Sequence, residues 1–287
     1  MNIAVVGHSE VAEFAPVERV PKQGDIVEVP ETFEVAAGGA AVAAVQIARL
    51  AGSCLFMTAV GSDARGELVA PELTKRGLRV EAARRTIDQR RAFVYLDAEG
   101  ERTITTIGTR VFPEIEDPLP WDELKAFDAV YLTAGNAGTL RAARAAKNVV
   151  ATVRTGTALT EAGVQVDVLV ASANDSGEQY NRGDIDPAPR WVVRTDGSRG
   201  GSLESADGKV TRWDSHPPTG PRGDTYGAGD SFAGGITYGL GRGLSIEKAI
   251  AVGAFCGALA VRGRGPYEAQ ASAEELREFE ESLDVSP

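Results

Sequence analysis

Residues 38–61, GGAAVAAVQIARLAGSCLFMTAVG, decide the fold class of this chain. After the glycine pair Gly38 and Gly39, alanine and other apolar residues recur at helical spacing, and Gly52 supplies a stop, so we expect a helix there. The continuous apolar run over 54–61 has the length and composition of a strand that is buried on both faces. A helix followed directly by a fully buried strand indicates a parallel sheet covered by helices.

The same alternation extends in both directions along the chain. The run IAVVG at 3–7 is predicted to be the first buried strand. Further strands are expected at 129–135, 149–153, 166–172 and 191–197, and helices at 67–76, 138–147, 175–182, 229–241, 245–261 and 273–283. We therefore predict an α/β fold with a doubly wound, mostly parallel sheet flanked by helices.

Two irregular segments interrupt this alternation. Residues 11–35 hold scattered prolines and short alternating pieces, which suits exposed strands. The stretch RRAFVYLDAEGERTITTIG at 90–108 has two β-rich pieces joined by a DAEG turn, the pattern of a hairpin. We expect about 11–36 and 79–110 to form a small sheet set apart from the main one, within a single domain of residues 1–287.

The overall composition excludes several classes of function. The net charge of −11 disfavours binding to nucleic acid or to an anionic membrane, so an anionic ligand needs a local site. Cys54 and Cys256 lie in apolar stretches without metal-binding spacing and are expected to be buried thiols. No signal peptide or membrane-spanning run is apparent, which predicts a cytoplasmic protein.

Residues 223–235, GDTYGAGDSFAGG, have the features of an anion site with an acid beside it. The segment from Gly227 through Ala228 to Gly229 lets the backbone approach a ligand at a helix start, where free N–H groups favour an anion. Asp230 falls in the first helical turn, so its carboxylate is placed to accept a proton from an attacking hydroxyl. On spacing alone, a tight loop followed by an acid that the helix dipole favours is an equal alternative.

The full string from Asp224 to Gly235 resembles the carboxy-terminal signature of the PfkB, or ribokinase-like, carbohydrate kinase family, Asp-Thr-x-Gly-Ala-Gly-Asp before a small apolar helix. The resemblance implies a ribokinase-like fold and ATP-dependent phosphorylation of a hydroxyl group on a sugar or sugar-like molecule. It makes Asp230 the catalytic base and the amides of Gly227, Ala228 and Gly229 the anion hole. It also makes 11–36 and 79–110 the family's lid over the sugar, which pairs subunits in several relatives and so suggests a homodimer.

Other parts of the chain resemble the family less closely. Gly38 and Gly39, with the string at 61–66, look like its sugar-site region. The segment at 191–201 is similar to its strand and glycine turn, and 260–266 looks like its loop beside the adenine. The resemblance also allows a monovalent cation beside Asp224 and Thr225. It adds these nucleotide-binding candidates: Thr195, Gly197, Asp224, Thr225, Arg264 and Gly265.

Two departures from the family pattern concern the sugar. Relatives that bind ribose-like substrates commonly carry an Asp after the first strand and an Asn in the helix after the glycine pair, where this chain has Ala12 and Ala43. Missing polar partners for a buried sugar cost about 1 to 3 kcal/mol each, which argues against ribose itself. We propose Glu10 as the replacement acceptor for a sugar hydroxyl, because it lies at the carboxyl end of the first strand. A solvated loop carboxylate is an equal alternative for Glu10.

A third departure concerns Mg²⁺. The family's Asn-x-x-Glu element, which helps to place Mg²⁺ and phosphate through water, corresponds here to Asn174-Asp175-Ser176-Gly177-Glu178. The glutamate is displaced by one residue, and Asp175 is an added candidate beside Glu178. Because Mg²⁺ takes oxygen ligands and keeps several waters, such a site remains compatible with it.

Two alternatives stay open from the sequence. The same scaffold accepts sugars with a base attached, which leaves a nucleoside kinase of the adenosine type. A ligand-sensing protein that kept the nucleotide pocket without efficient catalysis is also compatible with Ala12, Ala43 and the displaced Glu178. The intact string from Asp224 to Asp230 favours the kinase.

Overall fold

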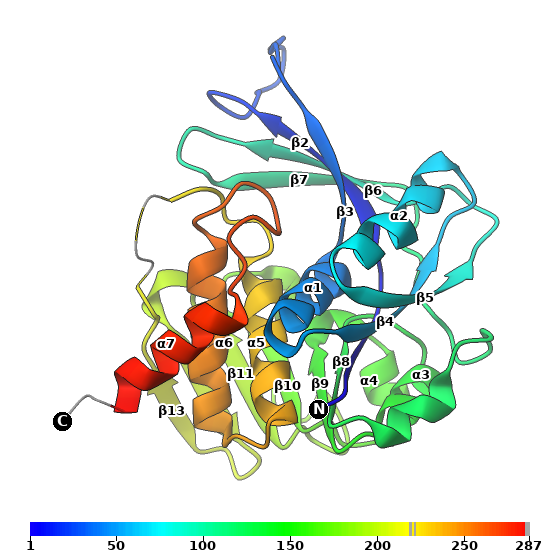
Figure 1. Cartoon of the computed structure of the whole chain (residues 1–287), viewed down its shortest axis with the longest axis vertical. Coiled ribbons are helices and arrows are strands. Elements are labelled where there is room, and N and C mark those ends of the chain that lie inside the picture. Colours follow the sequence, from blue (N-terminus) through cyan, green and yellow to red (C-terminus); the bar gives the residue numbers. More distant parts are fainter. Residues whose placement is uncertain (218–219, 221, 285–287) are drawn as a thin grey trace.

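A nine-stranded sheet forms the body of the molecule in the computed structural model, which describes residues 1–217, 220 and 222–284 (Figure 1). The order is β13-β12-β11-β10-β9-β8-β1-β4-β5; the seven strands from β11 to β5 run parallel, and the β12–β13 hairpin is antiparallel at one edge. The strands are β1 (Ile3–Val6), β4 (Cys54–Val60), β5 (Leu78–Arg84), β8 (Ala129–Leu132), β9 (Asn148–Thr152), β10 (Val168–Ser172), β11 (Trp191–Thr195), β12 (Gly201–Ser205) and β13 (Val210–Trp213).

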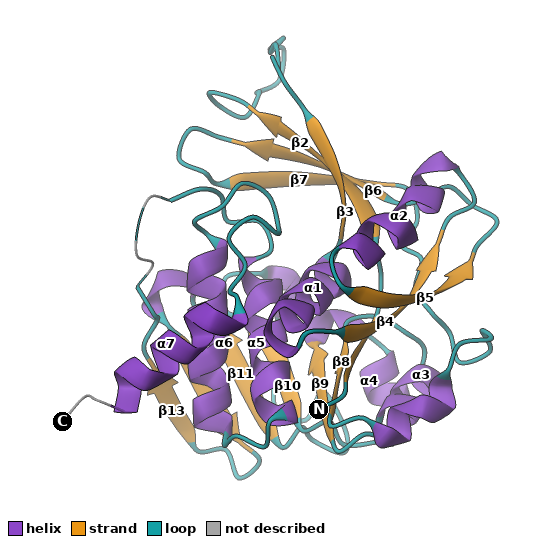
Figure 2. Cartoon of the chain, in the orientation of Figure 1, coloured by secondary structure: helices purple, strands orange, loops and turns teal. Residues whose placement is uncertain are grey.

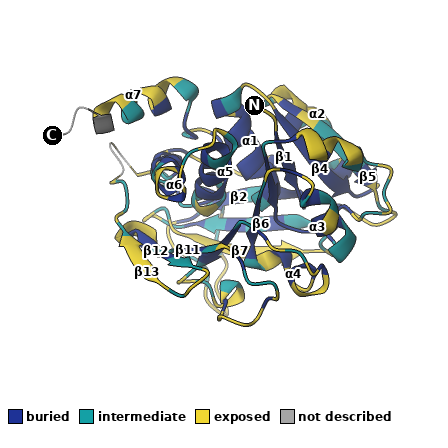
Figure 3. Ribbon diagram, turned by 90° about the horizontal axis from the view of Figure 1, so that it is seen from below, coloured by how far each residue is buried: buried dark blue, intermediate teal, exposed yellow. Residues whose placement is uncertain are grey.

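Both faces of the central strands of this sheet are buried, as the apolar runs predict. In β1, Ile3 and Val5 belong to the core on one face, and Ala4 and Val6 to the core on the other. The first core holds side chains of α1 (Gly39–Ala51), α2 (Ala64–Lys75), α5 (Ala228–Gly241), α6 (Ile246–Ala260) and α7 (Ala273–Asp284); the second holds those of α3 (Ala137–Ala143), α4 (Ala158–Glu161) and the 3₁₀ helix η1 (Trp121–Ala126). Figure 2 shows these helices around the sheet, and Figure 3 shows the buried strands between them.

Helix α5 is wedged between α1 and α6 because its glycines allow close approach. A Cβ at Gly235 would lie 2.8 Å from Gly253 Cα of α6, and one at Gly234 would lie 2.9 Å from the carbonyl oxygen of Ala43 in α1. Side chains at these positions would therefore push the helices apart. This packing fixes α5, and with it the position of its N-terminus.

A separate four-stranded sheet stands above one end of the body (Figure 1), and we call it the lid. Its order is β3-β2-β6-β7, built from β2 (Glu10–Pro16), β3 (Phe33–Ala37), β6 (Arg91–Leu96) and β7 (Arg102–Ile107). The prediction that 79–110 belongs to the lid is wrong for its first part, because residues 78–84 form β5 and pair with β4 in the main sheet. An edge strand with one covered face shows the same alternation as a lid strand, so the pattern did not separate the two.

The predicted helix at 175–182 is also replaced by a shorter element, the 3₁₀ turn η3 (Ser176–Glu178). Asp175 Oδ1 accepts a hydrogen bond of 2.8 Å from the amide of Gly177, and such a local side-chain bond competes with helix formation. The remaining 3₁₀ turns are η2 (Val153–Thr155) and η4 (Gly197–Arg199). Within the described ranges, no helix has both the length and the apolar character needed to cross a membrane.

Candidate active site

A cavity of about 740 Å³ lies between the lid and the carboxyl ends of the main-sheet strands. Thr133 follows β8, Arg154 follows β9 and Asn174 follows β10, and all three line it. Ligands of open parallel sheets collect at this edge. The lid supplies the opposite wall through Glu10 and through Arg102, Ile104 and Thr106 of β7. The cavity is thus enclosed by two sheets that are separate in the fold.

The start of α5 opens into this cavity. Gly227 precedes the helix with a φ of 79°, a left-handed conformation that favours glycine. Gly227 and Gly229 line the cavity, and a Cβ built on Gly229 would meet nothing within 4 Å, so the first turn, whose N–H groups have no carbonyl four residues back, is open at Gly229. The partly buried Asp230 carboxylate lies over Gly39, where a Cβ would come within 2.6 Å of Oδ1. The structure therefore places Asp230 and the open turn beside one space.

The surroundings of Asp230 disfavour its charged form. Burial raises its pKa to about 6, and the negative charges of Glu178 and Glu10 act in the same direction, against Arg102 and Arg154. A carboxylate with a pKa near neutrality is a better proton acceptor than an ordinary Asp while it is still ionised at physiological pH. The raised pKa is therefore compatible with the predicted role of Asp230 as a base.

The tip of the lid touches the segment before Asp230. The amide of Thr225 donates to the carbonyl of Gly100 at 3.2 Å, and Arg102 Nη1 donates to Thr225 Oγ1 at 2.9 Å. Gly100 has a φ of 75°, and a Cβ there would come within 2.1 Å of the carbonyl oxygen of Gly223. The turn between β6 and β7 is therefore docked on the motif that starts α5.

Glu10 lines the cavity at the start of β2 and is only 7% exposed. Its Oε2 lies 3.3 Å from Arg90 Nε, and Tyr226 hydrogen-bonds its carboxylate. Burial raises the pKa of Glu10 in spite of the arginines nearby. Ala12 and Ala43, where the resemblance would place sugar-binding polar groups, are both fully buried in the core. At this end of the cavity Glu10 therefore offers an acceptor that those two positions do not.

Asp175 and Glu178 lie together on the cavity wall, where both form ion pairs with Arg154. Arg154 Nε donates to Glu178 Oε1 at 2.7 Å. Within the described ranges, no cluster of three or more His, Cys, Asp or Glu side chains is placed to hold a metal ion. Two carboxylates nevertheless fit Mg²⁺, because Mg²⁺ in nucleotide sites takes one or two protein carboxylates and completes its shell with water and phosphate.

The predicted nucleotide-binding residues are only partly gathered in this cavity. Thr195 lines it at the end of β11, together with Gly227 and Gly229. The cavity lining does not include Gly38, Gly197, Thr225, Ala228 or Gly265. Gly38 instead packs against the backbone of the β1–β2 connection, where a Cβ would lie 3.2 Å from His8 O and from Glu10 N. The nucleotide contacts predicted outside the cavity stay predictions.

Asp224 has a structural place beneath the motif. Its buried carboxylate accepts from the amide of Tyr226 at 2.9 Å and from that of Gly265 at 2.6 Å, and burial raises its pKa. These bonds tie the start of α5 to the loop after α6. Each carboxylate oxygen of Asp224 thus already accepts a hydrogen bond from an amide. That a monovalent cation assists beside Asp224 stays a prediction.

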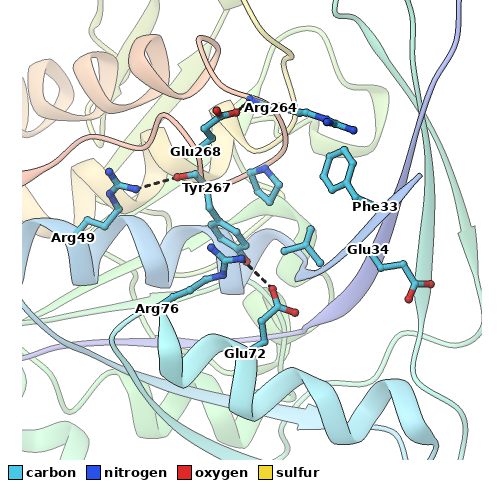
Figure 4. Close-up of a pocket in the computed structure, with 10 residues that line it drawn as sticks. Phe33, Glu34, Arg49, Glu72, Arg76, Arg264, Tyr267 and Glu268 are labelled. Carbon is cyan, nitrogen blue, oxygen red and sulfur yellow. Dashed lines mark hydrogen bonds and ion pairs between the residues drawn. The ribbon is translucent and has the colours of Figure 1, made fainter. Parts of the chain in front are cut away.

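Arg264 lies in a second pocket, outside the cavity just described (Figure 4). Its guanidinium carbon is 4.3 Å from the centre of the Phe33 ring, and Arg76 stacks in the same way on Tyr267 at 4.2 Å. This pocket of about 450 Å³ lies between α1, α2, β3 and the loop after α6. The predicted role of Arg264 beside the adenine therefore receives no support from its side-chain position.

The sequence interpretation missed four arginines that line the main cavity, Arg90, Arg102, Arg110 and Arg154. They come from separate segments: Arg90 precedes β6, Arg102 lies in β7, Arg110 follows it, and Arg154 follows β9. No local motif links them. The available signal was basic residues at strand ends in a chain with a net charge of −11.

Comparisons with known proteins agree with this geometry. A family model described as "pfkB family carbohydrate kinase" matches residues 1–273. The ATP-dependent ribose-1-phosphate kinase of Halopiger xanaduensis is 26% identical over 284 residues, which cover 94% of this chain and 95% of that protein.

Solved structures share the fold. Arabidopsis thaliana ribokinase complexed with ribose and ATP superposes with a TM-score of 0.78 at 21% identity, covering 97% of this chain and 98% of that one. Adenosine kinase from Sinorhizobium meliloti superposes with a TM-score of 0.79 at 18% identity, covering 97% of this chain and 99% of that one. The predicted ribokinase-like fold is confirmed, and because the family model spans nearly the whole chain, the protein belongs to the pfkB family of carbohydrate kinases.

Proposed function

We propose that this chain transfers the γ-phosphoryl group of ATP to a hydroxyl group of a sugar or sugar-like molecule, with Asp230 as general base. The observation that carries the proposal is the carboxylate of Asp230 beside the open first turn of α5, within one cavity under the lid. The names of similar proteins support ATP-dependent phosphorylation of this substrate class: one is an ATP-dependent ribose-1-phosphate kinase, and a ribokinase was solved with ribose and ATP.

The reaction follows from the placement of these groups. The acceptor hydroxyl oxygen attacks the γ-phosphorus, its proton passes to an Asp230 carboxylate oxygen, and the bond to the β-γ bridging oxygen breaks to release ADP. The amides of Gly227, Ala228 and Gly229 stabilise negative charge on the transferred group. Glu10 accepts a second substrate hydroxyl, which holds the acceptor against the lid.

Mg²⁺ would be held beside Asp175 and Glu178, with water and nucleotide phosphate oxygens completing its shell. Bound there, it would neutralise charge on the phosphate oxygens. Arg154, which pairs with both carboxylates, keeps their side chains at the cavity wall. The lid excludes water from the space around Asp230, which protects the phosphoryl group from hydrolysis.

A panel assay tests this proposal. Purified protein with MgATP is offered sugars, sugar phosphates and nucleosides, and ADP and the phosphorylated acceptor are quantified by mass spectrometry. At least one acceptor should gain a single phosphoryl group with an equal yield of ADP, and the panel separates a sugar kinase from a nucleoside kinase. A folded protein that binds ATP and phosphorylates none of the panel would favour a ligand-sensing role and contradict the proposal.

A further inference from the structure

The end of the cavity that faces Glu10 carries two arginines with incomplete partners. Arg90 lies in ion-pair distance of Glu10, 3.3 Å from Nε to Oε2, but that Nε is buried without a hydrogen bond. Arg110 has no carboxylate within ion-pair distance among the residues that the structure describes, and its Nε is likewise buried and unpaired. Two guanidinium groups thus share one carboxylate.

The hydrogen bonds of Arg110 show which of its N–H donors remain free. Nη2 donates to His8 Nδ1 at 2.8 Å and to the carbonyl oxygen of Thr133 at 3.1 Å, and Nη1 donates to that of Arg154 at 3.3 Å. These bonds use three of the five N–H groups of a guanidinium and involve no anion. Because the charge is delocalised over the group, an anion that reaches Nη1 would compensate all of it.

His8 adds a neutral donor to this end. An arginine cannot accept a hydrogen bond, so the contact with Arg110 requires Nδ1 of His8 to be the accepting nitrogen and Nε2 to carry the proton. Burial and the charges of Arg110, Arg90 and Arg154 lower the pKa of His8 well below its usual value. The imidazole therefore stays neutral on the cavity wall beside two cations.

A purely structural role explains these arginines poorly. Arg90 and Arg110 repel each other, because two like charges are held together in a partly buried space. Burial, together with the charges of Arg90 and Arg154, lowers the pKa of Arg110 to about 10. A buried cation without a full partner costs stability. In a chain with a net charge of −11, carboxylates are plentiful, yet none lies within ion-pair distance of Arg110 among the described residues.

We propose that the acceptor is a phosphorylated sugar, and that Arg110 and Arg90 bind its phosphate while Asp230 receives the proton of a hydroxyl at its other end. This inference rests on the proposed kinase function and names its substrate class. Two guanidinium groups and an imidazole N–H offer more donors than the two oxygens of a carboxylate accept, whereas a phosphate monoester presents three oxygens and two charges. A neutral sugar would leave Arg110 without an anion in ion-pair distance.

The arrangement also orients the substrate. The charges that act most strongly on Asp230 are those of Glu178, Arg102, Glu10 and Arg154, whereas Glu10 is acted on by Arg90 and Arg110. Glu10, the two arginines and Asp230 all line the same cavity. The phosphate binds at the Arg110 end, a ring or chain hydroxyl meets Glu10, and the reacting hydroxyl lies at Asp230, so the product is a sugar bisphosphate.

Matched pairs of acceptors test the inference. Ribose is compared with ribose 1-phosphate and ribose 5-phosphate, and fructose with fructose 1-phosphate and fructose 6-phosphate, each with MgATP; gluconate represents sugar acids. At least one phosphate ester should exceed its parent sugar in kcat/KM by about 100-fold or more, the size expected for a buried charge pair. A higher kcat/KM for the parent sugars or for gluconate would overturn the inference and leave the kinase proposal standing.

Variants locate the phosphate. Arg110→Met should raise the KM for the preferred ester by about 100-fold and leave the KM for ATP unchanged, and Arg110→Lys should restore part of the affinity. The exposed Arg84, paired with Glu67, supplies the matched control Arg84→Met, which should change neither value. Unchanged ester affinity in Arg110→Met would contradict the assignment.

Binding separates this inference from the kinase proposal. Calorimetric titration of the same esters into Asp230→Asn needs no turnover, and the affinity should fall when Arg110→Met is added to it. Ester binding that depends on Arg110 in a protein without turnover on any acceptor would support the phosphate site and reject the kinase function. No ester binding to Asp230→Asn would reject the phosphate site.

Discussion

In the proposed mechanism the chemistry depends on Asp230, and the environment of this residue predicts the pH dependence of the reaction. The base works only when ionised, and its pKa is raised to about 6 by burial and by Glu178. We expect kcat/KM to be level above about pH 7 and to fall roughly tenfold per unit below pH 6. Initial rates from pH 4.5 to 8.5, with ATP affinity followed over the same range, measure this. A flat profile down to pH 5 would contradict the assignment.

The same raised pKa predicts a cost in stability. The pKa of Asp230 is about 6 in the folded protein, against the usual 3.8. The unfolded chain therefore binds fewer protons between these values, and this contribution to the free energy of unfolding falls as pH rises through the window. Asp230→Asn should stabilise the protein at pH 7.5 by about 1 to 3 kcal/mol. Thermal unfolding of both proteins at pH 7.5 and pH 4 measures this stabilisation. An equally large stabilisation at pH 4 would show that the raised pKa of Asp230 is not its cause.

At the scale of elements, the start of α1 shapes the space for the base. Gly39 is the first residue of α1, and a Cβ there would come within 2.6 Å of Asp230 Oδ1. We expect Gly39→Ala to displace the carboxylate and lower kcat by about 100-fold, because such small misplacements are costly in catalysis. Alanine suits a helix, so thermal stability and ATP affinity should be retained. A kcat within twofold of the natural protein would refute this account of Gly39.

The elements differ in how far the sequence predicts them. The helix α5 and the glycine turn that begins it are predictable because one contiguous string supplies the glycines, the acid and the small apolar face. Residues 78–84 and 91–107 look alike as alternating strands, and only tertiary pairing assigns the first to the main sheet and the second to the lid. Arg90, Arg110 and Arg154 come together only in the folded protein, so no local pattern predicts their cluster.

At the scale of the whole molecule, the lid and the body must meet to close the site. The turn at Gly100 docks on Gly223 and Thr225, directly before the helix that carries Asp230. Gly100→Ala introduces both a strained φ and a contact of 2.1 Å with the Gly223 carbonyl oxygen. We expect an open lid, a higher KM for the acceptor and more ATP lost to water.

The ratio of free phosphate to phosphorylated acceptor measures this leakage. Gly24→Ala is the matched control, because Gly24 also has a positive φ, of 90°, but a Cβ there meets nothing within 4 Å. The ratio should rise severalfold in Gly100→Ala and stay unchanged in Gly24→Ala. An equal rise in both variants would show that the docked turn has no part in excluding water.

The central claim is that Asp230 removes the proton of the acceptor hydroxyl, and Asp230→Asn tests it most directly. Single-turnover phosphoryl transfer with a saturating acceptor is measured beside the dissociation constant for ATP. The amide keeps the shape of the side chain but cannot accept the proton as a carboxylate does, so we expect transfer to slow by more than about 100-fold while ATP affinity stays within about twofold. Transfer at nearly the natural rate would contradict the account.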